Sequence, residues 1–127
     1  MKPEIANKKD ILKIITNFYS LLLADKQMIP FFEDIVKANH LTAHLAIISD
    51  FWHDILFNTN SYKNNTMQKH LDKNRFVAFK KQHFVIWTSY LFETIDASFS
   101  GVVASQMKNR ATSIATVMQL KMNLYKK

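Results

Sequence analysis

The chain has 127 residues, so we expect a single domain, residues 1–127, built around one core. It contains no cysteine, which excludes disulfide scaffolds, thiolate zinc sites and cysteine nucleophiles. The net charge of +7 permits contact with nucleic acid or an anionic membrane, but the lysines lie in scattered pairs rather than along one stripe. This pattern favours a solvated, lysine-rich surface with neither nucleic acid nor membrane as a partner.

The low content of glycine and proline limits the fold class. One glycine and two prolines provide few of the tight turns that an all-β fold requires. Hydrophobic residues make up 48% of the chain and aromatic residues 13%, which is enough to fill a core and also line an apolar cavity. The N-terminal MKPEIANKKD lacks the apolar core of a signal peptide, and no apolar run approaches a membrane span. We therefore expect an all-α, cytoplasmic protein.

Helical periodicity begins near the N-terminus. Apolar residues recur at helical spacing from Ile11 to Leu22, and Asp10 is the expected N-cap of a helix that runs to about Asp25. A bend and a short helix follow in MIPFFEDIVK, with Pro30 near its start. The stretch HLTAHLAIISDFWHDILF predicts a strongly amphipathic helix, because its apolar residues step by four, four, four and three: Leu41, Leu45, Ile48, Trp52 and Ile55.

A polar, asparagine-rich stretch separates the two halves of the chain. NTNSYKNNT is expected to form a loop, and Thr66 could cap a short helix, MQKHLDK. A long helix is predicted in RFVAFKKQHFVIWTSYLFETID and a last one over about residues 101–124, with a weak break at 97–101. The sequence thus predicts five or six helices.

Most signatures of catalysis are missing. Gly101 stands alone, so no glycine-rich phosphate loop exists, and neither an HExxH motif nor a nucleophile elbow occurs. His40 and His44 are spaced for chelation by one helix, but His40 lies at the expected helix start and should be exposed. We therefore do not favour a metal site formed by this pair.

Three amphipathic side chains remain on apolar helix faces: Tyr19, His44 and Trp87. A buried tyrosine hydroxyl or tryptophan indole N–H requires a hydrogen-bond partner. These residues could satisfy one another, or they could point at one bound ligand. Composition alone favours the first interpretation.

The order and spacing of several segments resemble the truncated haemoglobins, specifically their group III, over about residues 10–122. The segments that carry the resemblance are FY at 18–19, PFF at 30–32, HLAIISDFW at 44–52, LFNTNSYKNNTMQKHL at 56–71, HFVIWTSYLFETID at 83–96 and GVVASQMKNRATSIA at 101–115. The resemblance implies a shortened globin fold, a two-over-two helical sandwich around haem b.

The resemblance also implies roles for individual residues. His70 matches the proximal histidine, which binds the haem iron through a neutral ring nitrogen. Tyr19, His44 and Trp87 match distal residues that donate hydrogen bonds to a ligand.

Further positions match the surroundings of the haem. Phe32 matches an aromatic residue at the haem edge, and Ile48 lies one helical turn after His44. Lys69 and Arg75 are candidates to pair with the haem propionates. His40 and His53 do not match iron-ligand positions, and His53 is expected to face solvent. His83 also lies off these positions and is a candidate neighbour of a propionate.

The sequence departs from the family pattern around the proximal histidine. Asn64 and Thr66 stand where relatives often carry glycine and proline, and the DKNRF that follows His70 is polar and basic where relatives often carry proline. The proximal geometry is therefore less well defined by the resemblance than the distal one.

Three functions follow from these observations. The first is a haem protein that binds O2, NO, CO or peroxide and acts as a nitric oxide dioxygenase or a peroxidase, with an electron donor that the sequence does not identify. Three convergent hydrogen-bond donors would slow the release of a bound ligand, so the protein would be poorly suited to bulk oxygen transport. The second is an oxygen or nitric oxide sensor or scavenger without turnover. The third is a haem-free helical module that binds an anionic partner.

Overall fold

The computed structural model describes residues 2–33, 36, 39–59 and 80–121, and the statements below concern this part of the chain. It contains four α-helices, one 3-10 helix and no strand, which confirms the predicted all-α class. The elements are α1 (Lys8–Leu22), η1 (Ile29–Phe31), α3 (Leu41–Phe57), α5 (Lys81–Ser98) and α6 (Val102–Lys121).

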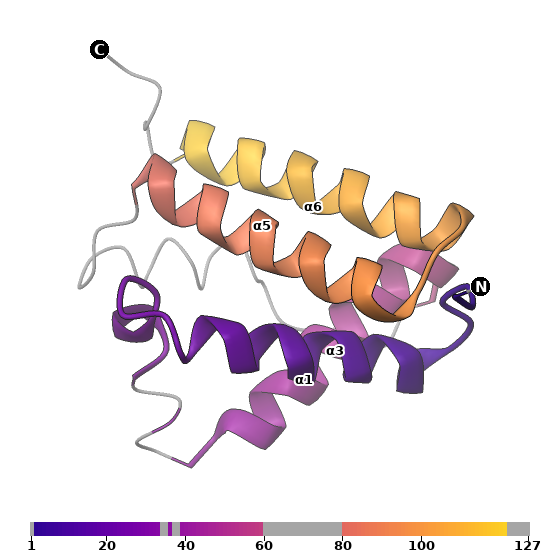
Figure 1. Ribbon diagram of the computed structural model, residues 1–127, viewed down its shortest axis with the longest axis horizontal. Coiled ribbons are helices and arrows are strands. Elements are labelled where there is room, and N and C mark those ends of the chain that lie inside the picture. The colour runs from indigo at the N-terminus through magenta and orange to yellow at the C-terminus, as the bar shows by residue number, and fades with distance from the viewer. Residues whose placement is uncertain (1, 34–35, 37–38, 60–79, 122–127) are drawn as a thin grey trace.

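The helices form two layers of two. In Figure 1, α5 and α6 run side by side as one layer, and α1 with α3 crossing behind it forms the other. Helix α1 packs against both α3 and α5, α5 packs against α6, and α3 reaches α6 across the molecule. The two pairs therefore enclose a common interior to which all four helices contribute side chains.

The core follows the helical periodicity of the sequence. Helix α1 buries one continuous face. Helix α6 also buries one face, on which Met107, Ala111, Ala115 and Met118 follow one another at intervals of four, four and three residues. Burial of each large apolar side chain stabilises the fold by roughly 1.5–3 kcal/mol. The core residues of these two helices are Ile11, Ile14, Ile15, Phe18, Tyr19 and Leu22 of α1, and Ala104, Met107, Ala111, Ala115 and Met118 of α6.

The start of α1 differs from the prediction. Asn7, not Asp10, is the N-cap, and its side-chain oxygen accepts a hydrogen bond from the backbone N–H of Asp10 at 3.0 Å. Asp10 lies in the first turn and accepts the backbone N–H of Ala6 at 2.9 Å. The two side chains therefore cap the helix reciprocally, and the carboxylate adds a favourable interaction with the helix dipole.

The other helix boundaries mostly agree with the prediction. Helix α1 ends at Leu22, three residues before the predicted end at about Asp25, whereas Pro30 lies in η1 as expected. The break at 97–101 is confirmed, because α5 ends at Ser98 and α6 begins at Val102. The helix predicted to start near Arg75 begins only at Lys81, since Lys80 has an extended backbone. Asn58 closes α3 in a left-handed conformation; most of the predicted loop and the short helix after it lie outside the described residues.

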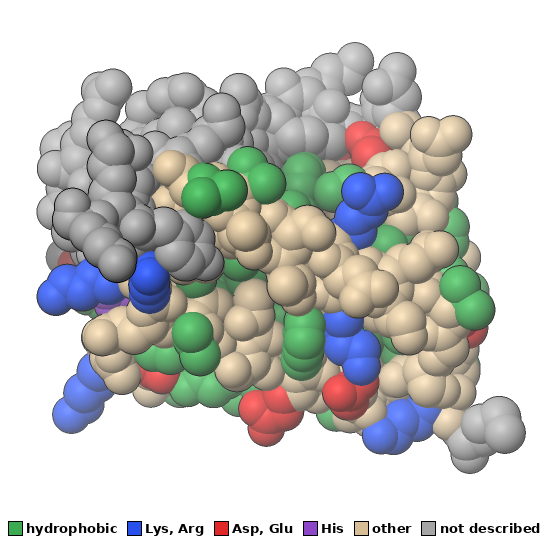
Figure 2. Space-filling model, turned by 90° about the horizontal axis from the view of Figure 1, so that it is seen from above, with side chains coloured by type: hydrophobic (Ala, Val, Ile, Leu, Met, Phe, Trp, Pro, Cys, Tyr) green, Lys and Arg blue, Asp and Glu red, His purple; other side chains and the backbone are tan. Residues whose placement is uncertain are grey.

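Charged side chains are scattered over the face of the molecule that Figure 2 shows. On the face formed by α5 and α6, lysine and arginine side chains are spread among polar and apolar groups (Figure 2). This agrees with the expected solvated surface. Of the helices that the structure describes, none has both the length and the apolar character to cross a membrane.

The segment before α1 is fixed to the start of α6. Ile5 is almost fully buried in the core. The Glu4 carboxylate accepts the backbone N–H of Ala104 at 2.9 Å in the first turn of α6. Gly101 has a φ of +114°, and a Cβ there would collide with the Glu4 carboxylate. Glycine is thus required at residue 101 for both its backbone conformation and its lack of a side chain.

Burial works to raise the pKa of Glu4, but hydrogen bonds from the backbone N–H groups of Ala104, Val103, Ile5 and Val102 together lower it below the usual 4.5. A lowered carboxyl pKa in the folded state stabilises the protein above the unfolded value. That contribution is lost as the pH falls through the folded value. Glu4 therefore links the stability of the fold to acid pH.

Glu4→Gln should lower the free energy of unfolding at pH 7, because the charged cap of α6 is lost. The difference from the wild type should shrink as the pH falls from about 4.5 through the lower pKa of the folded-state carboxyl, because the wild-type carboxyl then also becomes neutral. Urea unfolding between pH 3 and pH 7 measures this. Glu33→Gln removes an exposed acid and serves as the control; equal pH profiles for the two variants would contradict the role of Glu4.

Candidate functional site

A partly buried hydrogen bond joins α1 to α3. The Tyr19 hydroxyl lies 2.8 Å from Nε2 of His44, and the two rings meet edge to face with centroids 5.3 Å apart. Tyr19 is 6% exposed, whereas His44 is partly exposed in the first turn of α3. Two of the three amphipathic residues singled out in the sequence therefore satisfy one another.

The electrostatics keep the tyrosine protonated. Burial raises the pKa of Tyr19 well above its usual value, because a phenolate would be poorly solvated there. The neutral hydroxyl can donate to Nε2 of His44 or accept from an Nε2–H, depending on the histidine tautomer. In the second arrangement the Tyr19 O–H is available to donate to another acceptor.

An apolar cavity lies against Tyr19. Its volume is about 30 Å³, enough for a water or a diatomic molecule. All four α-helices and the end of η1 supply its walls, which are Phe18, Tyr19, Phe32, Ile48, Phe51, Trp52, Trp87, Ile114 and Met118. Tyr19 thus brings a residue with a polar hydroxyl to the wall of an otherwise mainly hydrophobic space.

A second cavity of about 20 Å³ adjoins the first. Phe32, Trp87 and Met118 line both, so these three side chains form the partition. Trp87 packs edge to face on Phe18 with ring centroids 5.8 Å apart. Within the described part of the chain, no residue accepts a hydrogen bond from the Trp87 indole N–H.

His83 lines the second cavity but serves as a helix cap. Its Nδ1 accepts a hydrogen bond from the backbone N–H of Lys80 at 2.9 Å. Its ring packs edge to face against that of Phe31, with ring centroids 4.7 Å apart. Burial, and then the charge of Lys80, lower the pKa of His83, while Asp25 opposes them. A neutral ring is the form that can accept this hydrogen bond, so the electrostatics and the capping role agree.

The structure brings together five of the residues expected at the site. Tyr19, Phe32, Ile48 and Trp87 line one cavity, and His44 is bonded to Tyr19. The expected proximal ligand His70 and the expected propionate partners Lys69 and Arg75 lie outside the described residues. Their assigned roles remain predictions.

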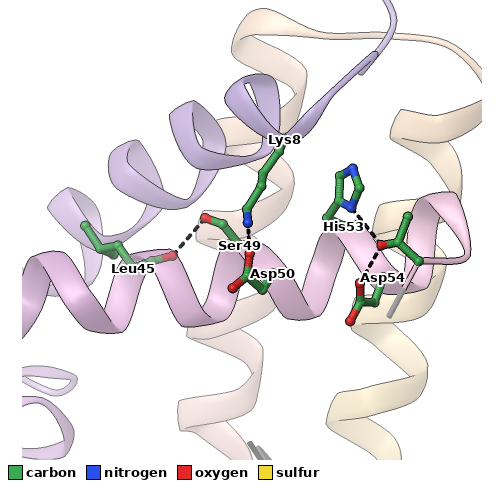
Figure 3. Close-up of polar contacts among 7 residues, drawn as sticks. Lys8, Leu45, Ser49, Asp50, His53 and Asp54 are labelled. Carbon is green, nitrogen blue, oxygen red and sulfur yellow. Dashed lines mark hydrogen bonds and ion pairs between the residues drawn. The ribbon is translucent and has the colours of Figure 1, made fainter. Parts of the chain in front are cut away.

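The other histidines are placed apart from the cavity. His40 is exposed at the start of α3, as expected, and the described residues hold no group of three or more potential metal ligands. His53 is only partly exposed, and its Nδ1 bonds the hydroxyl of Thr59, which in turn donates to Asp54. Figure 3 shows His53 and Asp54 at the end of α3, beyond the Lys8–Asp50 ion pair.

Sequence reasoning did not identify five of the wall residues: Phe18, Phe51, Trp52, Ile114 and Met118. Helical spacing does show that Phe18, Trp52, Ile114 and Met118 face the interior. The same spacing cannot separate a residue that fills the core from one that lines a cavity. Phe51 lies beside Trp52 and offered no periodic signal.

Comparison with known proteins places this geometry in context. No family model matches the chain. A group 3 truncated haemoglobin of Campylobacter jejuni is 27% identical over 121 residues, which cover 94% of this chain and 93% of that protein. The crystal structure of a group III truncated haemoglobin from Campylobacter jejuni covers 100% of this chain and 99% of its own at 26% identity, with a TM-score of 0.87.

The two comparisons agree in family and span nearly the whole chain. The structural comparison includes the four helices α1, α3, α5 and α6 that the structure describes. This chain therefore has the truncated globin fold, and its resemblance to the group III truncated haemoglobins is confirmed in both sequence and structure.

Proposed function

We propose that the chain binds haem b and holds a diatomic ligand such as O2, NO or CO beside Tyr19, His44 and Trp87. The observation that carries this proposal is the partly buried hydrogen bond between His44 and Tyr19, the latter a wall residue of an apolar cavity. The truncated haemoglobins that the chain resembles support the globin role and its haem cofactor.

The described residues fit the distal half of a haem site. Aromatic and branched side chains provide the apolar walls, and a cavity of about 30 Å³ suits a diatomic ligand rather than the macrocycle. Haem, when bound, supplies an iron that takes such a ligand and exchanges electrons with it. His70 is the proposed iron ligand, and Lys69 and Arg75 are the proposed propionate partners.

Tyr19 is the principal proposed donor. Its hydroxyl is neutral because burial disfavours the phenolate. A shift of His44 to the tautomer that carries Nε2–H turns Tyr19 into the acceptor of their shared bond and frees its own proton for the ligand. His44 then supports Tyr19 without breaking the hydrogen bond between them.

Trp87 is the second proposed donor. It lines the same cavity from α5, and within the described part of the chain its indole N–H has no protein acceptor. Donors fixed in a dry, apolar site stabilise negative charge more strongly than they would in water. The pair would therefore favour ligands on which negative charge develops.

We also propose redox chemistry on nitric oxide or peroxide at this site. Its support is the set of fixed, protonated donors, which can stabilise charge on an oxygen atom during bond cleavage. Turnover requires an external electron donor. A sensor or scavenger would use the same donors to retain its ligand, so measured consumption of nitric oxide or peroxide by the reduced protein separates the two functions.

The purified protein should show a Soret band with distinct ferric, ferrous and ferrous-CO spectra. His70→Ala should lose or shift that band, because the proposed iron ligand is removed. His53→Ala changes a histidine whose ring bonds Thr59 and serves as the control. A protein that takes up no added haemin would contradict haem binding, whereas unchanged spectra in His70→Ala would contradict only the proximal assignment.

Tyr19→Phe should raise the O2 dissociation rate by about 10- to 100-fold, the equivalent of one strong hydrogen bond of roughly 1.5–3 kcal/mol. Stopped-flow mixing of the oxygenated protein with a ligand trap measures this rate. Tyr90→Phe is the matched control, because the Tyr90 hydroxyl bonds Asp25 at 2.6 Å rather than the cavity. Equal rates in Tyr19→Phe and the wild type would remove Tyr19 from the ligand network.

Trp87→Phe should also raise the O2 dissociation rate, because the substitution keeps an aromatic wall and deletes only the indole donor. The effect should be clearest while Tyr19 is intact, since the two donors would share one ligand. The same stopped-flow assay on both single variants and the double variant measures their coupling. Strict additivity would indicate that the two residues do not act on a common ligand.

A further inference from the structure

A separate groove lies between the second half of α3 and the first half of α6. Its volume is about 480 Å³, within the range of small-molecule sites. Its walls are Ile55 and Leu56 on α3 and Gln106, Asn109, Arg110 and Ser113 on α6. It shares no lining residue with either cavity described above, and the proposed ligand chemistry makes no use of it.

The polar wall is one face of a single helix. Gln106, Asn109, Arg110 and Ser113 are spaced by three, one and three residues, so their side chains leave α6 on the same side. The residues of α6 that enter the core, such as Met107 and Ala111, point elsewhere. Helix α6 contains no aspartate or glutamate, so this wall carries one positive charge, two amides and a hydroxyl.

Arg110 is a cation without a protein counter-ion in the described part of the chain. It is exposed, and no hydrogen bond or ion pair there joins its guanidinium. Lys108, two residues earlier, is paired with Asp96 at 2.7 Å. Asp54, the acid next to the apolar wall, accepts the hydroxyl of Thr59 and does not line the groove. The guanidinium fork can therefore bind an anion.

The opposite wall is apolar, because Ile55 and Leu56 are only partly buried and face the same space. We propose that the groove binds an organic carboxylate. The carboxylate head would bind Arg110 with help from Asn109 and Ser113, and the apolar body would lie against Ile55 and Leu56. Electrostatic attraction and apolar burial would act on the two ends of one ligand.

Isothermal titration of the full chain, as purified, tests the proposal. Decanoate represents a flexible apolar body and 2-naphthoate a flat one, while decan-1-ol keeps the chain and removes the charge. We expect at least one carboxylate to bind with 1:1 stoichiometry and decan-1-ol to bind at least about tenfold more weakly. The preferred carboxylate identifies the shape of the apolar body.

Variants locate the binding. Arg110→Gln should weaken carboxylate binding about tenfold or more, because the charged fork is lost. Ser113→Phe should also weaken it by filling the groove. Lys108→Gln removes a cation from the neighbouring face of α6 and should bind as the wild type does. The proposal is overturned if neither carboxylate binds. It is also overturned if Arg110→Gln and Ser113→Phe both retain wild-type affinity, because the ligand would then bind elsewhere, for example in the central cavities.

Discussion

The hydrogen bond between Tyr19 and His44 organises the interior of this protein. A buried phenol must have a partner, and burial also prevents it from ionising. Because Tyr19 belongs to α1 and His44 to α3, that requirement fixes the two helices of one layer against each other at the edge of an apolar space. The cavity next to it is built from the same helices and from the opposite layer. The same contact therefore belongs both to the packing of α1 on α3 and to the site.

The rest of the molecule supports that contact from a distance. The capped start of α1 and the Glu4 contact with α6 fix helix ends that would otherwise leave backbone groups without partners. His83 does the same for α5, the helix that carries Trp87. In the part of the chain that the structure describes, few polar side chains are buried, and the cavity walls are mainly apolar. Such an arrangement suits a site in which a small number of donors select the ligand.

The sequence predicted the helical class, most helix boundaries and the grouping of Tyr19, His44, Phe32, Ile48 and Trp87. Periodicity supplied the helices, and the family resemblance supplied the grouping. The cap of α1 was misplaced because Asn7 and Asp10 are both good capping residues, and only the backbone shows which one precedes the helix. The start of α5 was predicted too early, because neither Lys80 nor Lys81 is a residue type that marks the beginning of a helix. The groove was not predicted, since its walls come from two helices, α3 and α6, that are far apart in the sequence.

The wall between the two central cavities has a chemical consequence. Met118 lines both spaces, and Met28 lines one of them. Thioether sulfur is readily oxidised by peroxide, and the sulfoxide that forms is polar and bulkier than the original side chain. If peroxide enters the site, an oxidised Met118 would disturb the partition and the apolar lining on both sides of it. Oxidation of Met118 would then accumulate as the protein reacts with peroxide, and the site would lose its apolar lining with use.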